Sequence, residues 1–70
     1  MKLRTEQIVR RDLHIAAAPV TLIYGAETGF DEFWSFGQPR MNADLHRQLA
    51  AERDAFIAAA EAHFRARQPD

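Results

Sequence analysis

The stretch NADLHRQLAAERDAFIAAAEAHFRAR, residues 42–67, decides the fold, because nothing within it breaks a helix. Alanine, leucine, glutamate, glutamine and arginine dominate it, and these residues favour helical backbone. Asn42 is a good N-cap, Asp44 suits the positive end of the helix dipole, and Pro69 follows the last turn. At about 100° per residue, one apolar stripe runs along the predicted helix: Leu45, Leu49, Phe56, Ile57, Ala60 and Phe64.

The length of this helix predicts self-association. About 25 residues rise by roughly 37 Å, whereas a compact domain of this chain length is roughly 28 Å across. The chain has 70 residues and no cysteine, so a disulfide cannot stabilise so small a core. We therefore expect a homodimer built on the long helix, in which small side chains let a second helix approach: the alanines at 50, 51, 55, 58, 59, 60 and 62.

A second stretch, GFDEFWSFGQP at 29–39, holds most of the aromatic residues. Thr28 and Asp31 match the [ST]-x-x-[DE] signal for a helix start, and Gly37 and Pro39 suit a helix end. This pattern predicts a short helix over residues 29–36. Residues at i, i+3 and i+4 share a helix face, and here they are Phe30, Phe33 and Trp34.

Most of these aromatic side chains are expected in the core against the long helix, since each removes roughly 150–250 Å² from water. One helix face cannot bury four aromatic rings against one neighbour, however. At least one ring should remain outside the core, and Trp34 and Phe36 are the candidates. Tryptophan is enriched where proteins bind one another.

Before the aromatic stretch, VTLIY at 20–24 reads as a short strand, because it is β-branched and aromatic and lies between Pro19 and Gly25. The preceding segment fits either a helix over 5–18 or a strand with alternating apolar residues. A strand at 20–24 needs a pairing partner, which favours a strand earlier in the chain. The expected fold class is α+β within one domain, 1–70: a small N-terminal β element, a short aromatic helix and a long C-terminal helix. An all-α fold is the alternative.

Composition limits the functional classes. The chain is 47% hydrophobic and 27% charged with a net charge of −1, values typical of a folded globule without a strong charge bias. No apolar run reaches the roughly 18 residues of a membrane span, and Lys2 and Arg4 precede no signal-peptide core. We expect a cytoplasmic protein.

No motif for catalysis is present. The histidines at 14, 46 and 63 lack ligand spacing, and Ser35 lacks a nucleophile motif. The glycines at 25, 29 and 37 form no phosphate-binding loop. We predict that the chain is not an enzyme and needs neither a cofactor nor a metal.

These observations predict a small protein-binding module, with another protein as its partner. An inhibitor or adaptor from a phage or mobile element, such as an anti-defence protein, is one specific form of this hypothesis. The expected binding surface combines acidic side chains with exposed aromatic rings: Glu27, Asp31, Glu32, Trp34 and Phe36.

The alternative is a nucleic-acid-associated regulator such as an antitoxin. It would use the basic first segment, with Arg4, Arg10 and Arg11. The net charge of −1 argues against it, since proteins that bind nucleic acid normally carry a basic surface.

Overall fold

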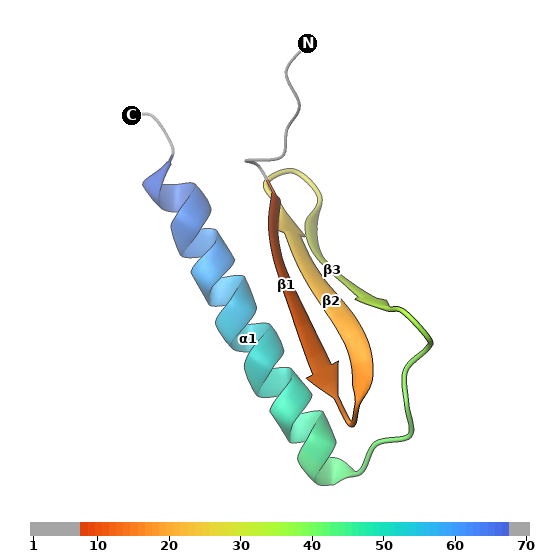
Figure 1. Ribbon diagram of the computed structural model, residues 1–70. Coiled ribbons are helices and arrows are strands. Elements are labelled where there is room, and N and C mark those ends of the chain that lie inside the picture. The colour runs from red at the N-terminus through yellow and green to blue at the C-terminus, as the bar shows by residue number, and fades with distance from the viewer. Residues whose placement is uncertain (1–7, 68–70) are drawn as a thin grey trace.

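Three antiparallel strands and one long helix make up the fold in the computed structural model, which describes residues 8–67. The strands β1 (Ile8–Ile15), β2 (Ala18–Gly25) and β3 (Gly29–Trp34) form a sheet in the order β1-β2-β3. The helix α1 (Ala43–Ala66) lies along one face of this sheet (Figure 1). The predicted α+β class is therefore confirmed, and the all-α alternative is excluded.

A two-residue turn joins β1 to β2. Ile15 pairs with Ala18, and both intervening residues have left-handed backbone, with φ of 53° at Ala16 and 67° at Ala17. Two positive φ values in a two-residue loop define the turn type that matches the twist of a hairpin. The strand interpretation of this first segment is thus confirmed for residues 8–15. The turn consists of alanines, so the usual asparagine or glycine signal is missing.

The aromatic stretch forms β3, and the predicted short helix over 29–36 is wrong. β3 pairs with β2 in a register that places Phe30 opposite Tyr24 and Trp34 opposite Val20. The backbone of this segment therefore bonds to a neighbouring strand instead of to itself. The predicted strand at 20–24 is confirmed and extends over the whole of β2.

The predicted long helix is confirmed almost to the residue. Asn42 caps it, because its side-chain oxygen accepts a hydrogen bond of 2.9 Å from the backbone N–H of Leu45. The expected stripe faces the sheet, with Leu49, Phe56 and Ala60 buried. Around them, Leu45, Ile57 and Phe64 are half-buried.

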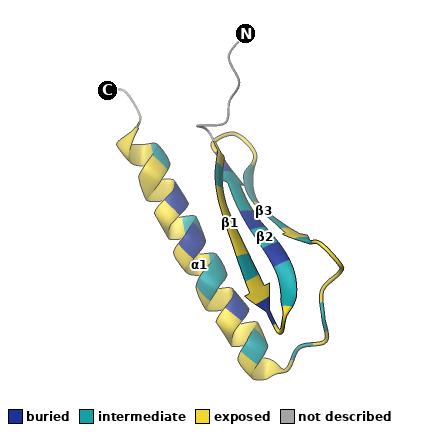
Figure 2. Cartoon of the chain, in the orientation of Figure 1, coloured by how far each residue is buried: buried dark blue, intermediate teal, exposed yellow. Residues whose placement is uncertain are grey.

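The core lies in the single interface between α1 and the sheet (Figure 2). Its buried side chains come from β1, β2 and α1: Ile15, Val20, Leu22, Leu49, Phe56 and Ala60.

The molecule is thin and elongated, with extents of 44 × 24 × 15 Å. Its radius of gyration is 13.8 Å, whereas a compact chain of this length has about 11 Å. The long helix therefore fits because the whole molecule is elongated and not compact. A helix about 36 Å long lies beside strands of eight residues. The ring of Tyr24, at the far end of β2, still reaches Phe64, with 6.1 Å between the ring centroids.

Candidate functional site

One face of the sheet carries no helix. In an antiparallel sheet, residues paired across strands point to the same side. The buried residues Ile15, Val20 and Leu22 point toward α1, so the alternate residues point away from it. We call this second surface the open face. Its side chains come from Ile8, Arg10, Asp12, His14, Pro19, Thr21, Ile23, Asp31 and Phe33.

Apolar side chains on the open face are left in solvent. Phe33 is 61% exposed and Ile8 is 51% exposed. Ile8 pairs with Gly25, which offers no side chain to cover it, and Phe33 pairs with the smaller Thr21. Phe36, two residues beyond β3, is 87% exposed. Among the residues that the structure describes, these are the large hydrophobic side chains most accessible to a partner.

The polar side chains of the open face bond to one another. The carboxylate of Asp12 accepts a hydrogen bond of 2.9 Å from the Thr21 hydroxyl and one of 3.3 Å from Nε of Arg10. The Thr21 bond and then the Arg10 guanidinium hold the pKa of Asp12 below its ordinary value of 3.8. The charge of Arg10 is thereby matched by its neighbour, and the open face is not a basic patch.

A different network lies on the helix side of β3. The carboxylate of Glu32 accepts a hydrogen bond of 2.7 Å from the indole N–H of Trp34 and one of 2.8 Å from Nε of Arg53 in α1. The side chain of Glu32 is only 17% exposed. This arrangement holds β3 against the helix, because one carboxylate satisfies donors from both elements.

At the other end of β2, the Tyr24 hydroxyl donates a hydrogen bond of 3.2 Å to Glu61 in α1. Burial of the phenol, followed by the nearby Glu61 carboxylate, raises the pKa of Tyr24 above its ordinary value of 10.0. This bond ties the last turns of the helix to the sheet.

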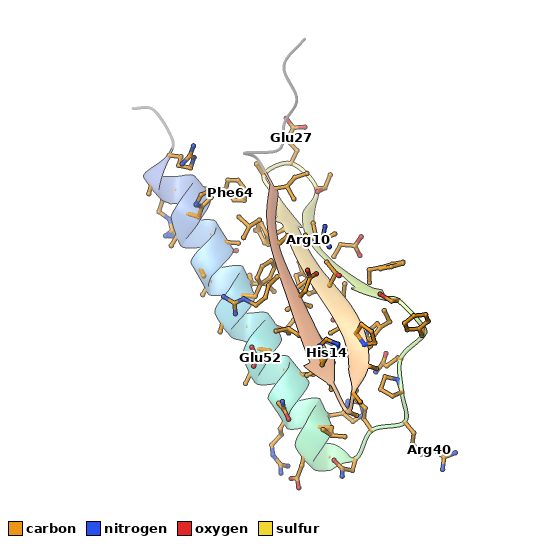
Figure 3. The ribbon with its side chains drawn as sticks, in the orientation of Figure 1. Arg10, His14, Glu27, Arg40, Glu52 and Phe64 are labelled. Atoms are coloured by element: carbon orange, nitrogen blue, oxygen red, sulfur yellow. The ribbon has the colours of Figure 1, made fainter. Side chains whose placement is uncertain are left out.

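The residues predicted to bind a partner do not form one surface. Asp31 lies on the open face, and Glu27 is exposed in the loop at the far end of the sheet from His14 (Figure 3). Glu32 and Trp34 face α1, and Trp34 is partly buried against the core instead of lying outside it. Phe36 is exposed, as expected.

The exposed apolar residues of the open face are not evident from the helical pattern in the sequence. Phe33 was expected in the core, because a helical period groups it with Phe30 and Trp34. A period of two separates them: Phe30 packs toward Phe56, with ring centroids 6.3 Å apart, while Phe33 points away. The sequence gives no clear signal for this, because the inward set of the strand includes the charged Glu32 and the outward set includes Phe33.

The side chains that commonly bind metal ions are not clustered in the described part of the chain. Within residues 8–67, no group of three or more His, Cys, Asp or Glu side chains is placed to hold a metal ion. In the same part of the chain, the helix is not apolar enough over a sufficient length to span a bilayer.

Comparison with known proteins gives no relative from which a function could be transferred: no family model, no curated protein and no solved structure matches the chain. The open face is therefore the feature of the molecule that best indicates a function.

Proposed function

We propose that this chain is a non-enzymatic protein-binding module and that the open face is its docking surface. The observation that carries the proposal is the exposure of Phe33 and Ile8 on a sheet face that no element of residues 8–67 covers. An exposed apolar side chain within a polar surround is typical of non-obligate protein interfaces, where a few large side chains contribute most of the binding energy.

The chemistry of this surface favours a folded protein with an apolar pocket and a basic rim. Phe33 supplies the anchor for the pocket, and Asp31 lies beside it on the same strand and face as a carboxylate that a lysine or arginine could meet. Glu27 extends the acidic character to the end of the sheet (Figure 3). By occupying a partner's surface, this module would act as an inhibitor or adaptor. This is the role expected if the chain comes from a phage or mobile element.

Nucleic acid is the weaker alternative. Arg10 lies on the open face and is paired with Asp12, whereas Arg11 points to the helix side. The Arg11 guanidinium lies 5.7 Å from the centroid of the Phe56 ring and 4.0 Å from the Glu52 carboxylate. These two arginines therefore do not form one basic surface of the kind that phosphates require. Arg4 lies outside the described residues.

The test compares affinity capture by three forms of the protein from cells that naturally contain it. Phe33→Ser removes the proposed anchor, and Ala58→Ser makes a small change on an exposed helix position that is not part of the open face. We expect a partner that the unchanged protein and Ala58→Ser retain and that Phe33→Ser loses, while circular dichroism shows all three folded. Equal retention of the partner by all three forms would contradict the proposal. Capture of nucleic acid instead of a protein, released from the protein at moderate salt, would also contradict it.

A further inference from the structure

Among the described residues, no strand pairs with the outer edge of β1. β1 is eight residues long and lies at one side of the sheet order β1-β2-β3, with no described strand beyond it. A long edge strand presents unpaired N–H and C=O groups, which are a template for another strand. The register from Ile8 to Ile15 is unbroken, so no bulge protects this edge.

The backbone groups that face outward can be assigned. The carbonyl of Pro19 accepts a hydrogen bond of 3.2 Å from the N–H of Ser35, so Pro19 bonds toward β3. Alternate residues of an antiparallel strand bond to opposite neighbours, so Ala18 and Val20 bond toward β1. Their partners on β1, Ile15 and Leu13, therefore direct their backbone N–H and C=O groups toward β2, as does every second residue of β1. The backbone groups of the four alternate residues point outward: Ile8, Arg10, Asp12 and His14.

These outward residues select one register for pairing between two copies of β1. Antiparallel pairing about a twofold axis at Arg11 uses all four, and it sets Arg10 opposite Asp12 of the second copy twice. An axis at Asp12 would place two carboxylates opposite each other, and an axis at Arg10 would place two guanidinium groups together. The axis at Arg11 also sets Arg11 opposite its own copy, so each of these three registers contains one like-charge pair, but of the three only the axis at Arg11 adds two pairs of opposite charge. Opposite charges across strands stabilise pairing and like charges destabilise it, so this axis is favoured.

Arg11 itself is compatible with this axis. Its side chain points to the helix side, where the Glu52 carboxylate is 4.0 Å away and the Phe56 ring lies beneath it. Two copies would therefore bring together two arginines and two glutamates around the axis. The like charges of the arginines are offset by carboxylates that are already in place.

The same register brings the two helices into contact. Paired residues point to the same side, so both copies of α1 lie on one face of the joined sheet. α1 packs against β1 and β2. With strands about 4.8 Å apart, helix axes centred between these strands would be about 10 Å apart across the twofold axis, close to the usual packing distance of 8–10 Å.

The flank of α1 on the β1 side carries small residues in the half that follows Glu52, whereas Gln48 and Leu45 precede Glu52 on the same side. Glu52 marks this flank, since it is the helix residue that meets Arg11. The positions that follow it at alternating steps of three and four residues share its side of the helix: Ala55, Ala59, Ala62 and Ala66. All four are exposed. Glu52 lies near the middle of α1 (Figure 3), so two antiparallel helices would meet along most of their length.

We propose that two copies of this chain pair through the outer edges of β1, antiparallel about an axis at Arg11. The product is one six-stranded sheet in the order β3-β2-β1-β1-β2-β3, with both helices on one face. The open faces of the two copies then become a single continuous surface with two Phe33 anchors. This dimer goes beyond the proposed function, because it forms from the pure protein without the docking partner.

Sedimentation of the pure protein and charge exchange test this proposal together. We expect a dimer at high micromolar concentration, weakened roughly tenfold or more by Asp12→Arg, which turns two attractive cross-strand pairs into repulsive ones. Arg10→Asp combined with Asp12→Arg restores opposite charges and should restore the dimer. A clean monomer of the unchanged protein would overturn the proposal, and so would a dimer that both forms keep equally.

A crosslink tests the position of the axis. Arg11→Cys places two thiols at the axis, where Cα atoms of directly opposed residues are about 4.5–5.5 Å apart, within the range for a disulfide. The unchanged chain has no cysteine, so mild oxidation with diamide should give one covalent dimer. Ala58→Cys is the exposed control on α1 and should stay monomeric. Faster crosslinking at position 58 than at position 11 would overturn the proposed arrangement, even if the protein is a dimer.

Discussion

Truncating two phenylalanines by the same change separates the covered face of the sheet from the open one. Phe56 is 1% exposed, and its ring contacts Phe30 and the guanidinium of Arg11. Phe56→Ala should therefore reduce the free energy of unfolding by about 3–5 kcal/mol. The single core of a chain this short rarely supplies more than about 3–5 kcal/mol, so this variant should be largely or wholly unfolded at room temperature.

Phe33→Ala should cost far less. Phe33 is 61% exposed, so only about two fifths of its ring area is removed from water on folding. Burying a whole phenylalanine stabilises by about 1.5–3 kcal/mol, so the expected loss is roughly 1 kcal/mol, including the lower strand preference of alanine.

Urea unfolding followed by circular dichroism measures both losses. All forms should be compared at one protein concentration, because dimer formation makes the midpoint depend on concentration. We expect a small shift of the midpoint with an unchanged slope for Phe33→Ala, and no folded baseline for Phe56→Ala. Similar losses for the two variants would refute the assignment of the faces, as would a larger loss for Phe33→Ala.

Three further predictions follow from the side-chain networks and the first turn. Glu32→Ala should lower the free energy of unfolding by about 2 kcal/mol, because Trp34 and Arg53 lose a charged acceptor, whereas Glu32→Gln should cost about half as much; chemical unfolding measures both. Replacing Ala16 and Ala17 by Asn and Gly should increase the free energy of unfolding by about 1 kcal/mol and so raise Tm, since both alanines have left-handed backbone. An unchanged or lower Tm would contradict the turn geometry. The lowered pKa of Asp12 means that its carboxylate stabilises the fold above the unfolded value of 3.8, and that this contribution is lost as the pH falls through the folded pKa. The stability of Asp12→Asn should consequently change less than that of the unchanged protein in acid titrations around and below pH 4, and equal acid sensitivity would count against the network.

The long helix could be predicted because every local signal in residues 42–67 agrees. Asn42 caps it, the apolar stripe has the helical period, and no residue interrupts it. The strand at 20–24 was equally clear from its β-branched residues. Its partner β1 followed only by inference, because a turn of two alanines gives no hairpin signal.

The aromatic stretch could not be assigned from its pattern alone. Phe30, Phe33 and Trp34 fit a helix face, while the strand that forms requires Glu32 to point toward the core side. A charged residue at an inward position is acceptable here because Arg53 and Trp34 meet its carboxylate. Those contacts come from residues distant in the chain or from geometry that only the fold creates. The open face was missed for the same reason, since Phe33 changes sides when the period changes.

The bare side of the sheet is the surface through which we propose that so small a chain binds its partner. One helix suffices to cover one face, and the fully buried apolar side chains of residues 8–67 lie in that interface. The second face then stays available, and it is supported by strand pairing and by the bonds of Asp12 to Thr21 and Arg10. Backbone that is already ordered by strand pairing loses less conformational freedom on binding than a loop would, which favours affinity.

Site-specific photocrosslinking in cells that naturally contain the protein tests the central claim most directly. A photoreactive phenylalanine analogue at position 33 should give one discrete covalent adduct with another protein, and the same group at position 58 on the exposed side of α1 should give none. Adducts of equal yield and identity from both positions would contradict the claim that the open face is the docking surface, as would a discrete adduct from position 58 alone.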